Sequence, residues 1–577
     1  MAAGSINNTK KAFSSLSVAA VLILLVLCIW KCNIETEILI PFLFVGILSA
    51  IILCLIKKIQ LPNALTIFSC VFASLVCSGL YTAFIYLFER YMMKYDISAF
   101  GSDVLVLSSA SFSLPGLIIS FLAYPAVLTA VAWISLAIVN GLKALNAKAL
   151  SNEIKNSLGG KQLVKIPCLL LLNLAIAAGL GTLLIWAVYS LPIDRIDDNM
   201  KSSADLLYNE GTYPSLYSWC FSRSDNFSDA IIMLEASDRN DASAVENAML
   251  SYRGNIEGLD PVHILKMHFI DGAEYDSEIS YSRYWQGYLT TIKPLLQITD
   301  YEGIRILNYG IQIVLSALIC LMMSKRGRKD IIIPFLIIYL MLMPPVMGRC
   351  LFFSSCYLVT LASVLALLLI KNEKWLPYLF LYTGIAAVYV DLMSFPILTF
   401  GIPAVLCLSL HAEDSFEHRL ILTLKNGLTW CLGFAGMWIL KWIIGDLITG
   451  EGVIRAALDM VAVRTSVSEA GSEAFSIYSV FGRNIIAFVF TPATLLVISY
   501  IIYLINRVKK NTDSLGVYSS LFLAALISLI PFFWYTFAAN HSIIHYWFTC
   551  KSLVIPIFAV MCGLSDVLHG SIQHKEM

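Results

Sequence analysis

Apolar runs long enough to cross a lipid bilayer recur along the whole sequence, and this feature limits the possible folds more than any other. A transmembrane helix needs about 20 predominantly apolar residues, and backbone groups inside a bilayer must pair within the segment, which favours helices. Only 14% of the residues are charged, against about 25% in soluble proteins. The runs lie near 14–31, 37–56, 64–88, 103–140, 166–190, 303–323, 331–348, 350–370, 375–393, 395–410, 426–444, 480–505, 516–537 and 550–568. The sequence therefore predicts an all-α integral membrane protein with about 14 transmembrane helices.

The basic residues in the short connections orient these predicted spans. Lysine and arginine in short loops stay on the cytoplasmic side of a membrane. Fourteen spans place every basic cluster on one side. The clusters are Lys10 and Lys11; Lys57 and Lys58; Lys143, Lys148, Lys155, Lys161 and Lys165; Lys325, Arg326, Arg328 and Lys329; Lys371 and Lys374; and Arg507, Lys509 and Lys510. We therefore expect a multi-pass protein of the cell membrane with both termini in the cytoplasm.

One long polar segment interrupts the apolar pattern and divides the chain. Residues 1–165 form a predicted N-terminal module of about four spans and a basic cytoplasmic loop, and 166–190 form the next span. Segment 191–302 holds nineteen acidic and eight basic residues, and we expect it to form a small, helix-rich extracytoplasmic domain. Residues 303–577 form a C-terminal transmembrane bundle, whose external loops are 445–479 and 538–549.

Several charged or titratable side chains lie at the predicted outer ends of the spans. They are Arg349, Asp391, Lys441, His541 and His545. Charges at membrane depth are costly and often functional. Arginine, lysine and histidine donors suit the oxygens of a phosphate or pyrophosphate, which suggests a binding site for a lipid phosphate. The alternative is that these residues are interfacial anchors whose charged ends extend to the aqueous boundary.

Two aspartates in the polar segment are the first candidates for catalysis. Asp225 and Asp229 are four residues apart, so in a helix both carboxylates project from one face. One such acid can act as a general base, and a pair can bind a divalent ion such as Mg²⁺ or Mn²⁺. The alternative is an N-cap acid followed by a first-turn acid at the start of a helix. Asp197 and Asp198 are competing candidates, with a solvated acidic turn as their alternative.

The remaining motifs mainly exclude functions. The chain contains no phosphate loop, dinucleotide fingerprint, nucleic-acid motif or Cys/His metal pattern. The predicted cytoplasmic loops are too short for a nucleotide-sugar domain, so a glycosyl donor would have to be lipid-borne. Aromatic residues between Tyr281 and Tyr288 have roughly helical spacing. They suggest either a surface against a sugar ring or, more often, an interfacial aromatic belt.

The architecture, with candidate acids and cations on the outer face and one enlarged external loop after an early span, resembles the GT-C superfamily of membrane glycosyltransferases. Three strings are similar to bacterial multi-pass proteins of that class. They are Tyr-Ser-Arg-Tyr-Trp-Gln-Gly-Tyr at 281–288, the span around Lys441, and Asn-His-Ser at 540–542 continuing through His545 to Phe548-Thr549. The resemblance covers roughly 166–568 and leaves the first four spans outside.

This resemblance implies a polyprenyl-phosphate-linked or polyprenyl-diphosphate-linked sugar donor, an envelope glycan as acceptor, and an acidic catalytic residue in the first large external loop. By that analogy Asp225 or Asp229 is the acid, and Arg349, Lys441 and His541 face the lipid phosphate. One departure is that an acidic pair directly after the preceding span, which many members carry, is matched only by Asp197-Asp198.

Two other functions remain open from the sequence. A transporter or a lipid or glycan flippase would need polar groups near the middle of the bilayer and paired broken helices. Proline-interrupted runs near 113–116 and 344–345 favour that alternative. A non-catalytic membrane assembly protein would use its acidic external domain to bind a partner, and it would not bring Arg349, Lys441 and His541 together.

Overall fold

The computed structural model describes residue 142 and residues 145–576, except 159–161, 194–195, 217–219, 239, 468–474, 476, 490–492 and 512–513. The four apolar runs predicted before residue 141, and Asp194 beside the candidate pair Asp197-Asp198, lie outside the described residues. Within them the chain is almost entirely helical.

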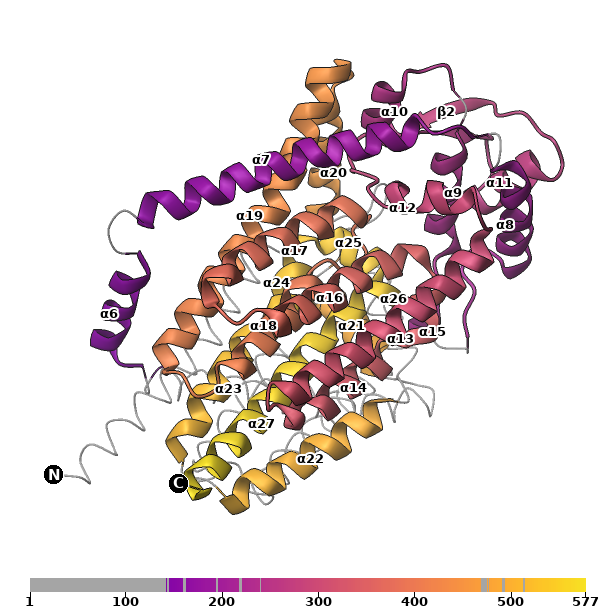
Figure 1. Cartoon of the computed structure of the whole chain (residues 1–577). Helices are drawn as coiled ribbons and strands as arrows, with labels where there is room; N and C mark the ends of the chain where they lie inside the picture. Colours follow the sequence, from indigo (N-terminus) through magenta and orange to yellow (C-terminus); the bar gives the residue numbers. More distant parts are fainter. Residues whose placement is uncertain are drawn as a thin grey trace, which may run out of the picture.

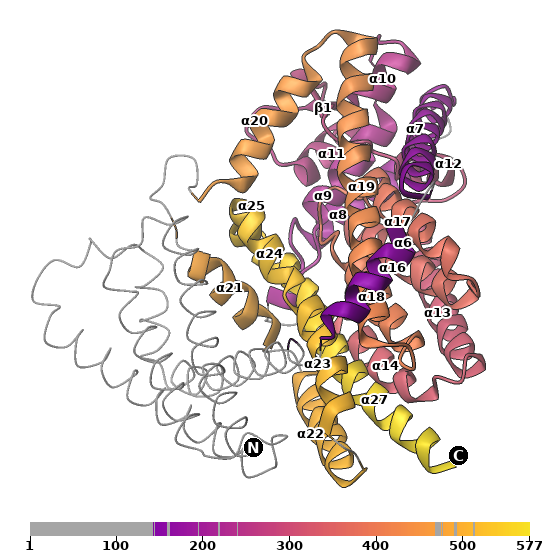
Figure 2. The same ribbon diagram turned by 90° about the vertical axis from the view of Figure 1, so that its left-hand side faces the viewer.

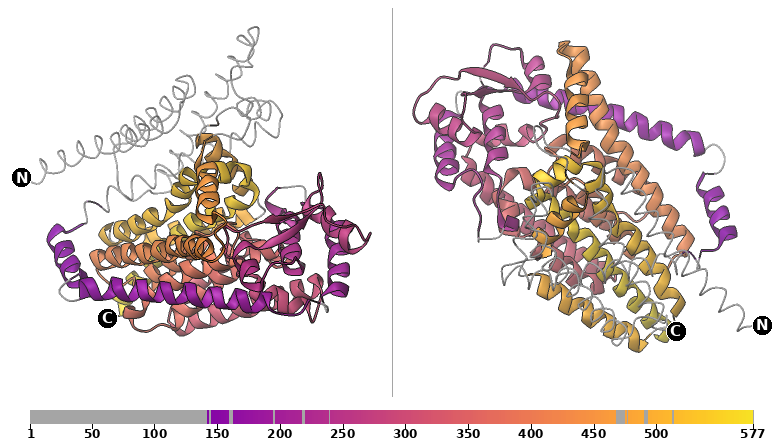
Figure 3. Two further views of the ribbon diagram at one scale, coloured as in Figure 1. Left: turned by 90° about the horizontal axis from the view of Figure 1, so that it is seen from above. Right: turned by 180° about the vertical axis from the view of Figure 1, so that it is seen from behind.

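Two helices lead into a small domain that corresponds to the acidic segment. Helices α6 (Ala147–Leu158) and α7 (Gln162–Tyr189) come first. Helix α7 runs along the outside of the molecule (Figure 1, and Figure 3, right panel). The domain then contains α8 (Asp197–Glu210), η2 (Cys220–Ser222), α9 (Asn226–Ser237), α10 (Ala244–Leu250), α11 (Pro261–Phe269) and α12 (Leu289–Leu296). Strands β1 (Tyr252–Asn255) and β2 (Ser277–Ser280) form an antiparallel pair in which Tyr252 lies opposite Ser280. The domain is helix-rich, as predicted, and its hydrophobic core continues to Tyr301 and Ile304 of the following helix and to Leu351 of the bundle.

The C-terminal half forms a helical bundle. Its elements are α13 (Tyr301–Lys325), η3 (Lys329–Ile331), α14 (Ile332–Met341), α15 (Pro344–Arg349), α16 (Leu351–Leu369), η4 (Glu373–Trp375), α17 (Leu376–Val390), α18 (Leu398–Leu410), α19 (Phe416–Thr449), α20 (Val453–Thr465), α21 (Ile477–Val489), α22 (Ala493–Asn511), α23 (Ser514–Ser528), α24 (Ile530–Phe537), α25 (Ala539–Ile544), α26 (Tyr546–Thr549), η5 (Cys550–Leu553) and α27 (Val554–Glu576). Local signals set several of these limits. The side chain of Ser415 caps α19, which ends at Gly450 in the left-handed conformation (φ 70°).

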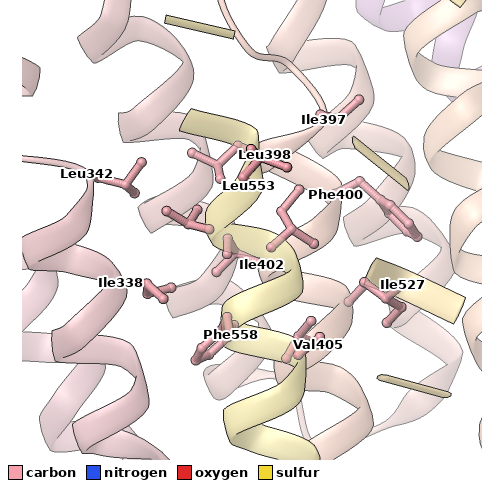
Figure 4. Close-up of a cluster of buried hydrophobic side chains, with 14 of the residues drawn as sticks. Ile338, Leu342, Ile397, Leu398, Phe400, Ile402, Val405, Ile527, Leu553 and Phe558 are labelled. Carbon is pink, nitrogen blue, oxygen red and sulfur yellow. The ribbon is translucent and has the colours of Figure 1, made fainter. Parts of the chain in front are cut away.

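Helix α27 lies at the centre of the bundle. Its side chain Phe558 packs among apolar residues of α14, α18 and α23, including Ile338, Val405 and Ile527 (Figure 4). Helices α17 and α19 approach each other through glycines. A Cβ atom added at Gly433 would lie 2.2 Å from the carbonyl oxygen of Leu381. Such close backbone approach through small residues is typical of helix pairs in membranes.

Six described helices are long and apolar enough to cross a membrane: Lys165–Tyr189, Tyr301–Lys325, Leu351–Leu369, Phe416–Thr449, Ser520–Phe537 and Tyr546–His569. They match six of the ten apolar runs that fall within the described residues. The other four runs form shorter helices than the sequence predicted. Run 331–348 is divided at Pro344-Pro345 into α14 and α15, because proline cannot continue the hydrogen-bond ladder of a preceding helix. Run 480–505 corresponds to α21 and α22, and residues 490–492 between these helices lie outside the described residues.

The two ends of the bundle differ in what they carry. The small domain lies at the upper right in Figure 1, at the same end as α15, α25 and α26, and the C terminus lies at the lower left (Figure 1). The opposite end holds the turns 326–331, 370–375 and 411–415, together with α6. The basic residues predicted to share one side, from Lys325 to Lys329 and from Lys371 to Lys374, lie in these turns, away from the small domain.

Candidate functional site

Asp229 fastens the small domain to the bundle. It is fully buried in the first turn of α9, and its carboxylate accepts hydrogen bonds from the backbone N–H groups of Leu351 (2.9 Å) and Phe352 (2.8 Å) and from the hydroxyl of Tyr301. It therefore satisfies free N–H groups at the beginning of α16 and lies at the favourable end of that helix dipole. Burial still raises the pKa of Asp229, to about 6. Both carboxylate oxygens of Asp229 therefore accept hydrogen bonds that hold the structure together.

Asp225 occupies a different environment although it is only one turn away. It is the N-cap of α9, and the Ser228 N–H donates to its Oδ1 (2.9 Å). Its side chain is 4% exposed, and burial raises its pKa to about 7. The positively charged Arg223 is close enough to oppose this shift. A carboxyl with a pKa near 7 can take up and release a proton at neutral pH, which a general base requires.

Glu210, at the end of α8, binds two arginines of the bundle. It pairs with Arg305 (2.7 and 2.9 Å) and with Arg349 (2.5 Å), and it also accepts from Asn226 Nδ2 (3.1 Å). Burial alone would raise the pKa of Glu210, but the hydrogen bonds and charge of Arg305 and the contact with Arg349 outweigh burial and lower it. Arg349, predicted to bind a lipid phosphate, therefore already has an anionic partner, and 29% of its side chain is exposed.

Asp197 and Asp198 lie at the other end of α8 from Glu210. Both are in the first turn of that helix, and Asp198 is exposed. At 1.5 Å per residue, the 12 to 13 residues that separate them from Glu210 place them roughly 20 Å from the buried acids. Acidic residues in a first turn are favourable near the positive end of the helix dipole. The structure does not bring these two aspartates together with Asp225.

The histidines of α25 and the residues that follow it form a ring-rich layer beneath the small domain. The rings of His541 and His545 lie 4.9 Å apart, and His545 stacks on Phe548 at 5.1 Å. Burial, together with neighbouring positive charge, lowers the pKa of His545 to about 3 and that of His541 well below its ordinary value. Both rings are therefore neutral at physiological pH, so they act as hydrogen-bonding groups and not as cations.

Two arginines that were not predicted from the sequence contact this layer. The guanidinium of Arg464, at the end of α20, lies 3.5 Å from His545 Nε2, and Arg223 lies over the ring of Trp547 at 5.5 Å. Trp547 also contacts Tyr213 (ring centroids 5.8 Å apart). Figure 2 shows one end of α20 lying close to α25, and the two helices are in contact. We call the group formed by Tyr213, Arg223, Asp225, Arg464, His541, His545 and Trp547 the Asp225 cluster.

Three buried N–H groups of the Asp225 cluster have no acceptor among the described residues. Because arginine can only donate, the contact from Arg464 makes His545 Nε2 an acceptor and places the proton of the neutral ring on Nδ1. That Nδ1, the Nε of Arg223 and the indole Nε1 of Trp547 are all buried without a partner. Buried donors are almost always satisfied in native proteins. Three unsatisfied donors in one cluster with a buried acid indicate a place where an oxygen-rich ligand or ordered water binds.

Asp391 and Lys441 complete local structures. Asp391 follows α17, is buried, and accepts hydrogen bonds from the N–H (2.9 Å) and hydroxyl (2.6 Å) of Ser394. Its turn reaches the Asp225 cluster, since the ring of His541 hydrogen-bonds to the backbone of Met393. Lys441 is fully buried in α19, and its ammonium donates to the carbonyl of Met249 at the end of α10 (2.8 Å). It therefore binds a helix C-terminus, where a positive charge is favourable.

A second polar group lies at the other end of α9. The carboxylate of Glu235 is fully buried and accepts from Tyr288, and its Oε1 has no partner among the described side chains. Burial raises the pKa of Glu235 to about 8, while the charges of Arg253 and Arg283 oppose that shift. Both arginines have buried nitrogens without partners. The sequence feature that could have pointed to this polar group is Arg283, which lies within the aromatic string 281–288.

The aromatic string itself forms neither a sugar platform nor an interfacial belt. Trp285 is fully buried and donates from Nε1 to the Met437 carbonyl of α19 (2.8 Å), and Tyr284 and Tyr288 are also buried. The prediction from spacing was wrong because the segment 281–288 packs inward between the small domain and the bundle. Gly287 permits this close packing, since a Cβ atom at that position would lie 2.4 Å from the carbonyl oxygen of Tyr389, to which the Gly287 N–H donates (2.7 Å).

The geometry of Arg349, Lys441 and His541 bears on the functions left open by the sequence. Each makes contacts with a different partner: Glu210, the end of α10, and the turn at Met393. These three residues therefore do not form a single cationic pocket, which is the arrangement predicted for a non-catalytic assembly protein. Asp225, Arg223 and Arg464 nevertheless belong to one connected cluster. Comparison of the chain with family models, with curated proteins and with solved structures gives no match.

Proposed function

We propose that the protein is a glycosyltransferase that takes a sugar from a polyprenyl-phosphate-linked donor and transfers it to a cell-envelope glycan on the extracytoplasmic face. The observation that carries the proposal is the Asp225 cluster, where a buried acid with a pKa of about 7 lies near Arg223. The same connected group of residues contains Arg464 and three N–H donors that have no acceptor among the described residues. Phosphate and sugar oxygens are acceptors that such donors bind.

The proposed reaction assigns a role to each group of the cluster. Asp225 removes the proton from an acceptor hydroxyl, whose oxygen attacks the anomeric carbon of the donor sugar. The bond between that carbon and the phosphate oxygen breaks, and the lipid phosphate leaves with the electron pair. Arg223 and Arg464 stabilise the negative charge that develops on the leaving phosphate. Tyr213 and Trp547 offer aromatic faces against which a sugar ring can pack.

The membrane orientation belongs to the same proposal. About fourteen passages, with both termini cytoplasmic and residues 191–302 extracytoplasmic, would place the basic turns on the cytoplasmic side, following the rule for short loops. The small domain and the Asp225 cluster would then face donors displayed on the outer leaflet. A periplasmic-reporter fusion after residue 270 should be active and one after Lys371 inactive. The reverse pattern would place the cluster in the cytoplasm and remove the argument for an external, lipid-borne donor.

A transfer and binding assay tests the proposed function. Purified protein in detergent is incubated with a panel of polyprenyl-phosphate sugars, and both saturable binding and release of the lipid phosphate in the presence of glycan acceptors are measured. We expect Asp225→Asn to retain binding and lose transfer at least 100-fold, because general-base catalysis contributes about 10²–10⁴-fold. Arg223→Gln should weaken binding, and the matched control Asp198→Asn should change neither quantity. Absence of binding across the panel by folded wild-type protein would refute the proposal.

The same assay separates the two alternatives. A lipid or glycan transporter would bind the donor without transferring the sugar, and Asp225→Asn would leave its uptake into vesicles unchanged. A non-catalytic assembly protein would bind no donor at all. The cationic pocket that the sequence placed at Arg349, Lys441 and His541 is replaced in this proposal by Arg223 and Arg464, since Arg349 and Lys441 already have protein partners.

A further inference from the structure

Four metal-ligating side chains meet at the end of the bundle opposite the Asp225 cluster. Glu373 belongs to η4, His411 and Asp414 to the turn after α18, and His418 to the first turn of α19. One ligand atom from each lies within 4.8 Å of the others. The closest pairs are His411 Nδ1 with Asp414 Oδ2 (2.7 Å), His411 Nδ1 with Glu373 Oε1 (3.3 Å), and His418 Nε2 with Glu373 Oε2 (3.3 Å).

These spacings are close to those of a tetrahedral zinc site. Zinc binds histidine nitrogen and carboxylate oxygen at about 2.0–2.2 Å, so neighbouring ligands of a tetrahedron lie about 3.4 Å apart. Two pairs lie at 3.3 Å, and His418 Nε2 and Asp414 Oδ2 lie at 3.9 Å. Small rotations of exposed carboxylates, which are 44% exposed for Glu373 and 42% for Asp414, would bring the remaining pairs into range.

A fifth side chain orients His418 as a metal ligand. His418 Nδ1 lies 2.8 Å from Oε1 of Glu153 in α6. A histidine that binds a metal usually gives its other N–H to a carboxylate, which fixes the tautomer and leaves the second nitrogen unprotonated. With its proton on Nδ1, the Nε2 lone pair of a neutral His418 would face oxygens of both Glu373 and Asp414. Acceptor atoms that face one another at these distances need a proton or a metal ion between them, so either the ring carries a second proton or a metal ion binds there.

We propose that Glu373, His411, Asp414 and His418 bind one divalent metal ion, of which zinc fits the donor set best, with Glu153 as the residue that orients His418. Two nitrogen and two oxygen ligands suit Zn²⁺, and four protein ligands are typical of structural sites and not catalytic ones. The ion would join α6, η4 and the α18–α19 turn at a place where three carboxylates lie close together. The site borders a cavity of about 500 Å³ that is also lined by Arg326, Lys371 and His569, so the ion can exchange with solvent.

Metal analysis of the whole protein tests this proposal independently of the glycosyltransferase assay. Untagged protein in detergent is incubated with Zn²⁺, desalted without chelator, and analysed for bound metal by mass spectrometry. We expect about one zinc per chain in the wild type, loss of it in His411→Ala and in Asp414→Asn, and retention in the control His263→Ala, whose histidine pairs with Asp260 in the small domain. Glu153→Gln should keep the site but weaken zinc affinity about 10-fold to 100-fold.

Each result has one meaning if folding is followed by thermal melting in the same samples. Two ligand variants guard against a single variant that fails to fold, and Asp414→Asn changes little more than charge. A folded wild-type protein that keeps no zinc and shows no saturable binding would overturn the proposal, leaving doubly protonated histidines as the cations of the cluster. Zinc retained equally by both ligand variants would also overturn it.

Discussion

Replacing Asp225 with asparagine should stabilise the protein at high pH while removing its proposed activity. The ordinary pKa of 3.8 is raised to about 7 in the folded protein because the side chain is buried. The folded state therefore holds the proton more tightly than the unfolded state does. The stability contributed by the neutral carboxyl is fully present below about pH 4 and is lost as the pH rises to about 7.

The size of this effect follows from the same two values. A difference of about three pH units corresponds to about 4 kcal/mol at 1.36 kcal/mol for each unit, and this is an upper limit. Asparagine carries no charge and is as good an N-cap as aspartate, so it should still accept from the Ser228 N–H. We expect Asp225→Asn to be about 2–4 kcal/mol more stable than the wild type at pH 8 and nearly equal to it at pH 4.

Thermal unfolding in detergent at pH 4, 6 and 8 measures this prediction, with Asp198→Asn as the control at an exposed site. The difference between the melting temperatures of Asp225→Asn and the wild type should grow with pH, while the control should show no such trend. A variant that melts at or below the wild-type temperature at pH 8 would refute the reasoning, because Asp225 would then be stabilised as the anion by contacts stronger than its burial.

Three further predictions concern stability and placement. Asp229→Ala should destabilise the protein by about 3–5 kcal/mol at pH 8, because it leaves two buried backbone N–H groups and a tyrosine hydroxyl without an acceptor; an unchanged melting temperature would contradict this. Gly433→Ala should cost about 1–3 kcal/mol through the clash with the Leu381 carbonyl, whereas Gly310→Ala, where a Cβ meets nothing within 4 Å, should be neutral or slightly stabilising. Lys441→Met should leave donor binding unchanged, since the ammonium binds Met249; loss of binding in a folded variant would return Lys441 to the lipid-phosphate site.

The positions of several long apolar helices could be predicted because they depend on local properties of the chain. The runs 303–323 and 350–370 agree within about two residues with α13 and α16, since length and hydropathy alone determine such segments. Run 331–348 was predicted as one span, and only the observed division at Pro344 shows where the helix stops. The existence of a helix-rich domain at 191–302 also followed from its length and polarity.

The candidate site was harder to predict because its contacts are remote in sequence. The spacing of Asp225 and Asp229 identified both acids, but only the amides of Leu351 and Phe352, more than 120 residues away, separate a structural acid from a candidate base. Arg464 could not be singled out because an arginine in a loop that is only predicted to be external carries no local signal of a binding site. Its contact with His545 depends on how α20 folds back over α25.

The fastening of the small domain to the bundle has a consequence for any attempt to divide the protein into pieces. A fragment limited to residues 191–302 would keep Asp229 and Glu210 but lose the amides of α16 and the guanidinium groups of Arg305 and Arg349. Its lower surface would then present two acids without their counterparts. The bundle expressed alone would expose two arginines and an uncapped helix start in the same place. The polar segment and the bundle therefore depend on each other for folding. A chimaera that takes segment 191–302 from a homologous protein should fold only when residues 301–305 and 349–352 are taken from the same protein.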